Sequence, residues 1–165
     1  VIYYLGNDDY GWFLPIYTHN YVYYNSNMGT YLMPGSEMED RWVIQNFFVD
    51  LSADYIKSNQ VGIWFNKYIE PYQNREIRKK LISFITGKEY VAGVMIPDEP
   101  IQKIFDKQAA FRKLGFETAL KKYEADYVLL SKQIIDSGKI PDMESFGSLS
   151  LIDRVGDNFI YKITR

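Results

Sequence analysis

An almost unbroken apolar run in the last third of the chain limits what this sequence can fold into. Residues 125–131, ADYVLLS, have the length of a β-strand and carry apolar side chains at successive positions. A strand with one exposed face alternates polar and apolar residues, whereas a continuous apolar run indicates burial on both faces, as in a parallel sheet covered by helices. The run therefore predicts a strand inside an α/β layer.

More β-prone segments lie at the two ends of the chain. Residues 1–5 and 21–24 read as short strands near the N-terminus. Residues 149–155 and 159–164 flank the turn sequence Gly156-Asp157-Asn158. These last two segments predict an antiparallel hairpin at the C-terminal end.

Helical patterns fill the middle of the chain. Ser36 and Glu39 have the spacing of a capping box, and apolar residues at helical spacing extend a predicted helix over about residues 37–56. A second helix is expected between Asn74 and Gly87, and a third over residues 101–114. The residues 90–96 form a possible strand between these two helices.

The second predicted helix is amphipathic. Its apolar side carries Ile77, Leu81, Phe84 and Ile85. Its other face carries Arg75, Arg78, Lys79 and Lys80. The basic run is either a solvated face or a contact for an anionic partner such as lipid headgroups.

The order strand, strand, helices, strand, helix, strand, strand predicts one α/β domain over residues 1–165. We expect a mixed sheet with helices packed on it, in two layers or a three-layer-like arrangement, and a C-terminal antiparallel hairpin. A chain of 165 residues can bury a core of its own without a disulfide or structural metal.

Composition excludes several classes of function. The chain has no cysteine and one histidine, so thiol chemistry and multi-histidine metal sites are unavailable. The net charge of −2 gives no reason to expect nucleic-acid binding. Neither a P-loop nor a dinucleotide fingerprint occurs in the sequence. We therefore expect no cofactor, no metal and no nucleic-acid partner.

The segment of residues 8–25 concentrates side chains that suit sugar recognition. Aromatic rings stack on the apolar C–H surface of a sugar, and carboxylates and amides bond its hydroxyls. The candidate ligand-binding residues are Asp8, Asp9, Tyr10, Trp12, Tyr17 and His19. The alternative is a tyrosine-rich strand that follows an irregular loop.

Each of these residues also has a purely structural interpretation. Asp8 and Asp9 are adjacent, so in an extended segment their side chains point to opposite faces, and they fit a turn better than a glycosidase pair. His19 lacks a recognisable nucleophile partner. Trp64-Phe65, with Tyr68 and Tyr72, could rim the same groove, contact a membrane interface or pack under a loop. No residue is assigned a catalytic role.

Three segments together resemble the extracytoplasmic C-terminal region of bacterial polytopic membrane glycosyltransferases of the GT-C type and of related multi-spanning proteins. They are GWFLPIYTHNYVYY at residues 11–24, LKKYEADYVLL at residues 120–130 and NFIYKI at residues 158–163. They cover about a fifth of the chain. The chain also begins within a predicted strand and lacks cysteine, so we expect a piece excised from a longer, extracytoplasmic protein.

The resemblance implies an accessory role beside a membrane active site. In that family the acidic residues that act on the lipid-linked sugar lie mainly in loops between the first transmembrane helices, which these 165 residues do not include. The leading hypothesis is a non-catalytic extracytoplasmic domain that lies against the transmembrane helices of its parent protein and positions a glycan or lipid-linked acceptor. The alternatives are a structural module without a ligand, which packs on those helices or on a partner, and a stand-alone soluble hydrolase.

Overall fold

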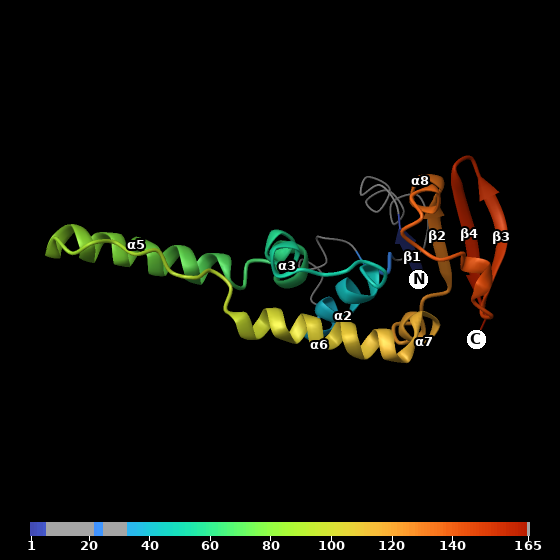
Figure 1. Ribbon diagram of the computed structural model, residues 1–165, viewed down its shortest axis with the longest axis horizontal. Coiled ribbons are helices and arrows are strands. Elements are labelled where there is room, and N and C mark those ends of the chain that lie inside the picture. Colours follow the sequence, from blue (N-terminus) through green and yellow to red (C-terminus); the bar gives the residue numbers. More distant parts are fainter. Residues whose placement is uncertain (6–21, 25–32, 165) are drawn as a thin grey trace.

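The computed structural model describes residues 1–5, 22–24 and 33–164. It confirms an α/β fold with a four-stranded mixed sheet (Figure 1). In space the strands follow the order β1-β2-β4-β3. Their bounds are β1 Ile2–Leu5, β2 Tyr127–Ser131, β3 Leu149–Val155 and β4 Asn158–Ile163.

The predicted buried strand is β2, which lies between a parallel and an antiparallel neighbour. Val128 pairs with Tyr3 of β1 on one side and with Tyr161 of β4 on the other. Val128 and Leu130 are completely buried, and the alternate residues Tyr127 and Leu129 are half-buried. The apolar run thus forms the predicted strand, but only one of its faces is completely buried, whereas burial on both faces was expected.

The C-terminal hairpin is also confirmed. β3 and β4 pair antiparallel around Gly156, whose φ of +58° is a left-handed conformation that glycine adopts without strain. The register shifts between Leu151 and Asp153, so β3 contains an irregularity. Apart from Leu149, every residue of β3 is exposed. β3 is therefore the solvent-exposed edge strand of the sheet.

The first predicted helix is shorter than expected. α2 (Gly35–Gln45) begins after Pro34 without a side-chain cap, so the proposed Ser36–Glu39 capping box is wrong. The chain leaves the helix at Asn46 and re-enters a helix at α3 (Ala53–Ser58), where the Ser52 hydroxyl caps the Tyr55 amide at 3.1 Å.

Side chains from a distant helix explain the break after α2. Gln108 of α6 (Asp98–Leu114) donates to the carbonyl oxygens of Asn46 at 3.3 Å and Val49 at 2.8 Å. Arg112 donates to the carbonyl of Phe47 at 3.1 Å. In a continuing helix these carbonyl oxygens would accept hydrogen bonds from backbone amides of the same helix. Here they accept from side chains of α6 instead.

The core lies where α2, α6 and α7 (Phe116–Lys121) meet the sheet. Phe116 packs edge-on against Tyr3 with ring centroids 5.6 Å apart. The completely buried Tyr3 hydroxyl donates to the Ile44 carbonyl at 3.0 Å. The Tyr3 hydroxyl thus joins the sheet to the end of α2.

A long arm projects from this core. α4 (Gln60–Trp64) leads into α5 (Ile69–Thr86), and Gly87, with φ +67°, ends the helix as predicted. Residues 88–97 then return beside α5 to the start of α6, and none of them forms the strand expected over residues 90–96. Figure 1 shows the arm extending away from the sheet at one end of the molecule.

Two short elements complete the architecture. α8 (Lys132–Asp136) directly follows β2, and a 3₁₀ turn, η2 (Met143–Ser145), precedes β3. Within the described residues, each helix is too short or too polar to span a bilayer.

Candidate functional site

The six residues predicted to bind a ligand lie outside the described residues. They are Asp8, Asp9, Tyr10, Trp12, Tyr17 and His19. The structure therefore neither brings them together nor separates them. It does describe Leu5 and Val22, which border the segment that contains them.

The chain leaves the sheet at the carboxyl end of a parallel strand pair. Leu5, the last residue of β1, pairs with Leu130, one residue before the end of β2. On the other border of the segment, Val22 forms a parallel bridge with Ile2, and the Tyr23 amide donates to the Ile2 carbonyl at 2.6 Å. The candidate segment is thus connected to β1 on both sides.

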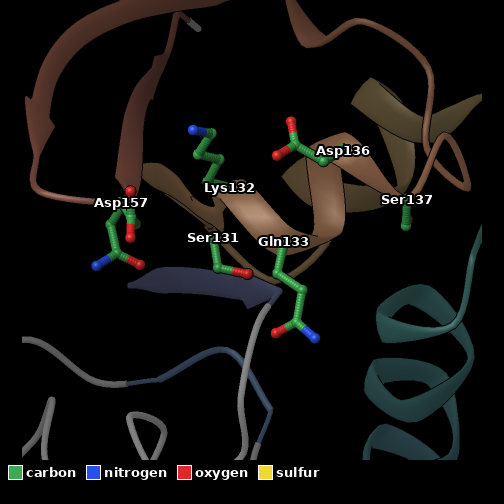
Figure 2. Close-up of a pocket in the computed structure, with 7 residues that line it drawn as sticks. Ser131, Lys132, Gln133, Asp136, Ser137 and Asp157 are labelled. Atoms are coloured by element: carbon green, nitrogen blue, oxygen red, sulfur yellow. The ribbon is translucent and has the colours of Figure 1, made fainter.

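A cavity of about 670 Å³ lies at the same carboxyl end of the sheet (Figure 2). We call it the sheet-edge pocket. Its lining residues are Ser131, Lys132, Gln133, Asp136, Ser137, Asp157 and Asn158. In open α/β sheets, ligands bind in crevices outside the carboxyl ends of the strands. The volume is within the range of small-molecule sites.

Local backbone geometry forms this pocket. β2 ends at Ser131, which pairs with Asn158 at the start of β4. The next residue begins α8, and the Lys132 amide donates to the carbonyl of Asp157 at 2.6 Å. The hairpin turn is therefore attached to the first turn of α8, and the side chains of both elements border one hollow.

The pocket offers hydrogen-bonding groups of several kinds. Its side chains supply hydroxyls, an ammonium, two amides and two carboxylates. The Ser131 hydroxyl oxygen is buried and has no hydrogen-bond partner among the described residues. In Figure 2, Ser131 and Gln133 lie on the β1 side of the α8 ribbon, whereas Lys132 and Asp136 point away from it. Such a lining can bond several hydroxyls of one small polar molecule.

A second group of charged residues surrounds two adjacent carboxylates on α2. Glu39 Oε2 lies 2.8 Å from Lys103 Nζ and 3.0 Å from Lys107 Nζ, and its Oε1 accepts from the Trp64 indole at 3.0 Å. Asp40 binds Lys107 at 2.5 Å and Lys122 at 2.6 Å, and accepts from the Tyr123 hydroxyl at 2.7 Å. We call these residues the α2 ion cluster.

The carboxylates of the α2 ion cluster are held in the ionised form. Burial would raise the pKa of Glu39, but hydrogen bonds from Lys103 and Lys107 outweigh it and lower the pKa. Burial opposes ionisation of Asp40 as well, and hydrogen bonds from Lys107, Lys122 and Tyr123 lower its pKa. Carboxylates that are ionised and bonded in this way stabilise the packing of α2 and are poor proton donors.

The sequence analysis missed this cluster because it assigned Glu39 to a helix cap. The available signal was a Glu-Asp pair placed between the apolar residues Met38 and Trp42 of the same helix. The cluster also resolves the role of Trp64, which is buried and bonded to Glu39, with its ring edge-on to Tyr68 at 5.2 Å. For Trp64, packing was the correct alternative.

A smaller cavity of about 490 Å³ borders the α2 ion cluster. Glu39 and Lys103 line it together with Tyr68 and charged residues of α6. Since Glu39 already has three partners, the cavity contains fewer uncommitted polar groups than the sheet-edge pocket. Among the described residues, no group of three or more acidic, histidine or cysteine side chains could hold a metal ion.

Comparison of the chain with protein-family models, with curated proteins and with solved structures found no match in any of the three.

Proposed function

We propose that this chain is a non-catalytic extracytoplasmic accessory domain of a membrane glycosyltransferase-like protein. In this role it positions a glycan or a lipid-linked acceptor, and the parent protein carries the transferase chemistry. The ligand occupies the sheet-edge pocket and contacts the segment of residues 8–19. The observation that carries the proposal is the pairing of Leu5 with Leu130, next to the pocket residue Ser131.

This pairing supports the proposal because it connects two independent features of the sequence. The aromatic and acidic segment follows β1 in the chain, and the polar pocket follows β2. In a parallel pair, the carboxyl ends of both strands point to the same edge. Sugar sites combine a stacking ring with several hydrogen-bonding groups, and the pocket supplies the second half of that combination.

Chemical-shift mapping by NMR on the 165-residue chain tests the binding. The ligands are methyl glycosides of neutral and N-acetylated hexoses at millimolar concentrations. We expect shifts at the amides of Ser131, Lys132 and Asn158, and weaker binding in Gln133→Ala and Trp12→Ala. Gln73→Ala, an exposed glutamine on the arm, is the matched control and should bind normally.

Two results would count against the proposal. One is the absence of any shift with all sugars at millimolar concentration. The other is a set of shifts that avoids the sheet edge, for example near Lys103 in the smaller cavity.

A structural module without a ligand is the second candidate, and the arm favours it. Phe84 on α5 is 88% exposed, which is unusual for a phenylalanine in a folded domain. A module of this kind would use the arm to pack against membrane helices or a partner. It predicts that Phe84→Asp disrupts assembly of the parent protein, whereas Gln133→Ala has no effect on it.

A further inference from the structure

One face of α5 carries an apolar stripe that the described residues leave uncovered. The stripe consists of Ile77, Leu81, Phe84 and Ile85, which are 64%, 58%, 88% and 71% exposed. At 100° per residue they span an arc of about 100° on the helix surface. This is the width of the apolar face that a helix normally buries.

The opposite face of α5 is already occupied. There Glu76 accepts from the Tyr90 hydroxyl at 2.6 Å and from the Gly93 amide at 3.1 Å, and the Ser83 hydroxyl donates to the Lys88 carbonyl. Residues 88–97 therefore pack against the polar side of the helix. This arrangement directs the apolar stripe outward and away from the chain's own return segment.

Cations border the stripe on both sides. Helical geometry places Arg78 about 70° from the centre of the stripe in one direction and Lys80 about 90° in the other. Lys88 lies just beyond the end of the helix. Residues 77–88 contain four cations and no acidic residue, although the chain as a whole has a net charge of −2. Lys79 is on the opposite face, 3.4 Å from Glu76 Oε1, so Arg78, Lys80 and Lys88 are the cations next to the exposed apolar residues.

These charges decide between possible occupants of the stripe. A second copy of the chain that covered it would bring the same cations into contact, and like charges at close range oppose such a dimer. An anionic lipid bilayer satisfies both features, because acyl chains cover the apolar side chains and phosphates attract the bordering cations.

We propose that α5 is an interfacial helix which docks the arm on an anionic lipid bilayer. The helix lies in the plane of the surface with Phe84 and Ile85 below the headgroups. The aliphatic stem of Arg78 extends along the apolar boundary and its charged end reaches the phosphates. The Lys80 ammonium, which lies 5.4 Å from the Tyr90 ring centre in the free chain, turns away from that ring to reach them.

This docking surface is separate from the sheet-edge pocket. The pocket is formed by β2, α8 and the β3–β4 turn, and Figure 1 shows the arm extending from the other side of the molecule. Lipid binding and sugar binding can therefore succeed or fail independently. The two proposals are tested with different ligands and different variants.

Vesicle co-sedimentation tests the proposal on the 165-residue chain. The probes are vesicles of phosphatidylcholine alone and vesicles that contain a third of phosphatidylglycerol. We expect binding to the anionic vesicles only, and weaker binding as salt increases. Phe84→Asp should reduce the affinity at least tenfold, because it places a charge within the inserted face. Its control is Ile152→Asp, which changes an exposed apolar residue on β3 (52% exposed) and should bind normally.

Neutral substitutions test the contribution of the cations that border the stripe. Arg78→Gln and Lys80→Gln should each weaken binding roughly fivefold, since a basic residue at an anionic surface contributes about that factor. Lys139→Gln, at an exposed position far along the chain from the arm, should leave the affinity unchanged. Equal losses in all three variants would indicate a general charge effect and overturn the assignment to α5.

The depth of residue 84 in the bilayer can be measured directly. Phe84→Trp should give an added fluorescence component that shifts to the blue and is quenched by brominated acyl chains when anionic vesicles are present. The proposal is overturned if the protein ignores anionic vesicles, if it binds neutral ones equally well, or if sedimentation equilibrium shows a dimer that Phe84→Asp dissociates while vesicles have no effect.

Discussion

The Tyr90 hydroxyl donates a hydrogen bond of 2.6 Å to the carboxylate of Glu76, and this contact attaches the return segment to α5. The same carboxylate accepts from the Gly93 amide and lies 3.4 Å from Lys79 Nζ. Gly93 permits this approach, because a Cβ at that position would lie 2.8 Å from Glu76 Oε1. One buried carboxylate therefore organises the base of the arm.

The Glu76 contact makes attachment of the return segment dependent on pH. The hydrogen bond from Tyr90, with support from Gly93 and Lys79, lowers the pKa of Glu76 from its usual 4.5 to about 2. The stabilisation is therefore complete above pH 4.5 and is lost as the pH falls toward about 2. The Gly93 amide shift, followed by NMR, should stay constant from neutral pH to pH 4.5 and change only below it.

A variant and its control extend this prediction. Glu76→Gln should reduce the hydrogen-exchange protection of the Gly93 amide at neutral pH. Glu70→Gln, an exposed carboxylate in the first turn of α5, should not change it. A wild-type Gly93 shift that titrates at the ordinary carboxyl pKa would contradict the assignment.

Removing one carboxylate from the α2 ion cluster should destabilise the fold. Asp40→Asn leaves Lys107 and Lys122 facing a neutral amide, and we expect the free energy of unfolding at pH 7 to fall by about 2 kcal/mol. This is below the range for a fully buried pair, because the Lys122 side chain is 46% exposed. Urea unfolding followed by tryptophan fluorescence gives the value.

The matched control is Asp50→Asn, whose carboxylate is 96% exposed and pairs with Arg112 at 3.1 Å. That change should lower the free energy of unfolding by roughly 0.5 kcal/mol or less. Because the pKa of Asp40 is lowered, its contribution is present above the usual aspartate pKa of 3.8 and is lost as the pH falls through the lowered pKa. The wild type and Asp40→Asn should therefore become similar in stability on acidification. A stability difference that stays constant with pH would show that the ionised Asp40 carboxylate is not its cause.

Arg41 should not be replaceable by lysine. Its guanidinium carbon lies 4.9 Å from the Tyr23 ring centre and 4.7 Å from that of Tyr123, and Nη1 donates to the Tyr23 carbonyl at 2.8 Å. Lysine cannot stack between two rings and bond the carbonyl at once. We expect Arg41→Lys to lower the free energy of unfolding by about 1 kcal/mol. Arg154→Lys, at an exposed arginine over one ring, should change it by less, and equal effects would argue against the double stacking.

Truncation of Phe116 should lower the stability of the fold much more than truncation of Phe84. Phe116 is 2% exposed and contacts the ring of Phe48 at 4.7 Å, so Phe116→Ala should destabilise the fold by about 3–4 kcal/mol. Phe84→Ala should change stability by no more than about 0.5 kcal/mol, because its side chain is already in solvent. Thermal or urea unfolding measures both, and a large loss in Phe84→Ala would show that the stripe packs within the fold.

Of the strands expected from the sequence, β1, β2 and the C-terminal hairpin were confirmed, whereas residues 90–96 form no strand and the described residues 22–24 form only a bridge at Val22. The apolar run at residues 125–131 and the turn at Gly156 identified β2 and the hairpin, because those signals are local. The end of α2 could not be predicted. It depends on Gln108, whose amide bonds two carbonyls about sixty residues earlier in the chain, and periodicity contains no information about such a partner.

The exposure of the apolar face of α5 could not be predicted from the sequence. The spacing of Ile77, Leu81 and Phe84 correctly predicted a helix with one apolar face. It could not show that the fold leaves this face open, since periodicity records which residues share a side and not what covers them. For the candidate site, the sequence suggested the segment after β1, whereas the sheet-edge pocket depends on the packing of α8 against the hairpin turn and had no local signal.

Both ends of the arm are fixed in the core. The chain enters it beyond the buried Trp64 and returns to the buried Ile96. A segment attached to the core at both ends moves together with it, whereas a segment attached at one end can move independently. A force on the tip of α5 would therefore reach α6 and the sheet as a change of angle, so whatever the arm rests on also sets the orientation in which the rest of the domain faces its surroundings.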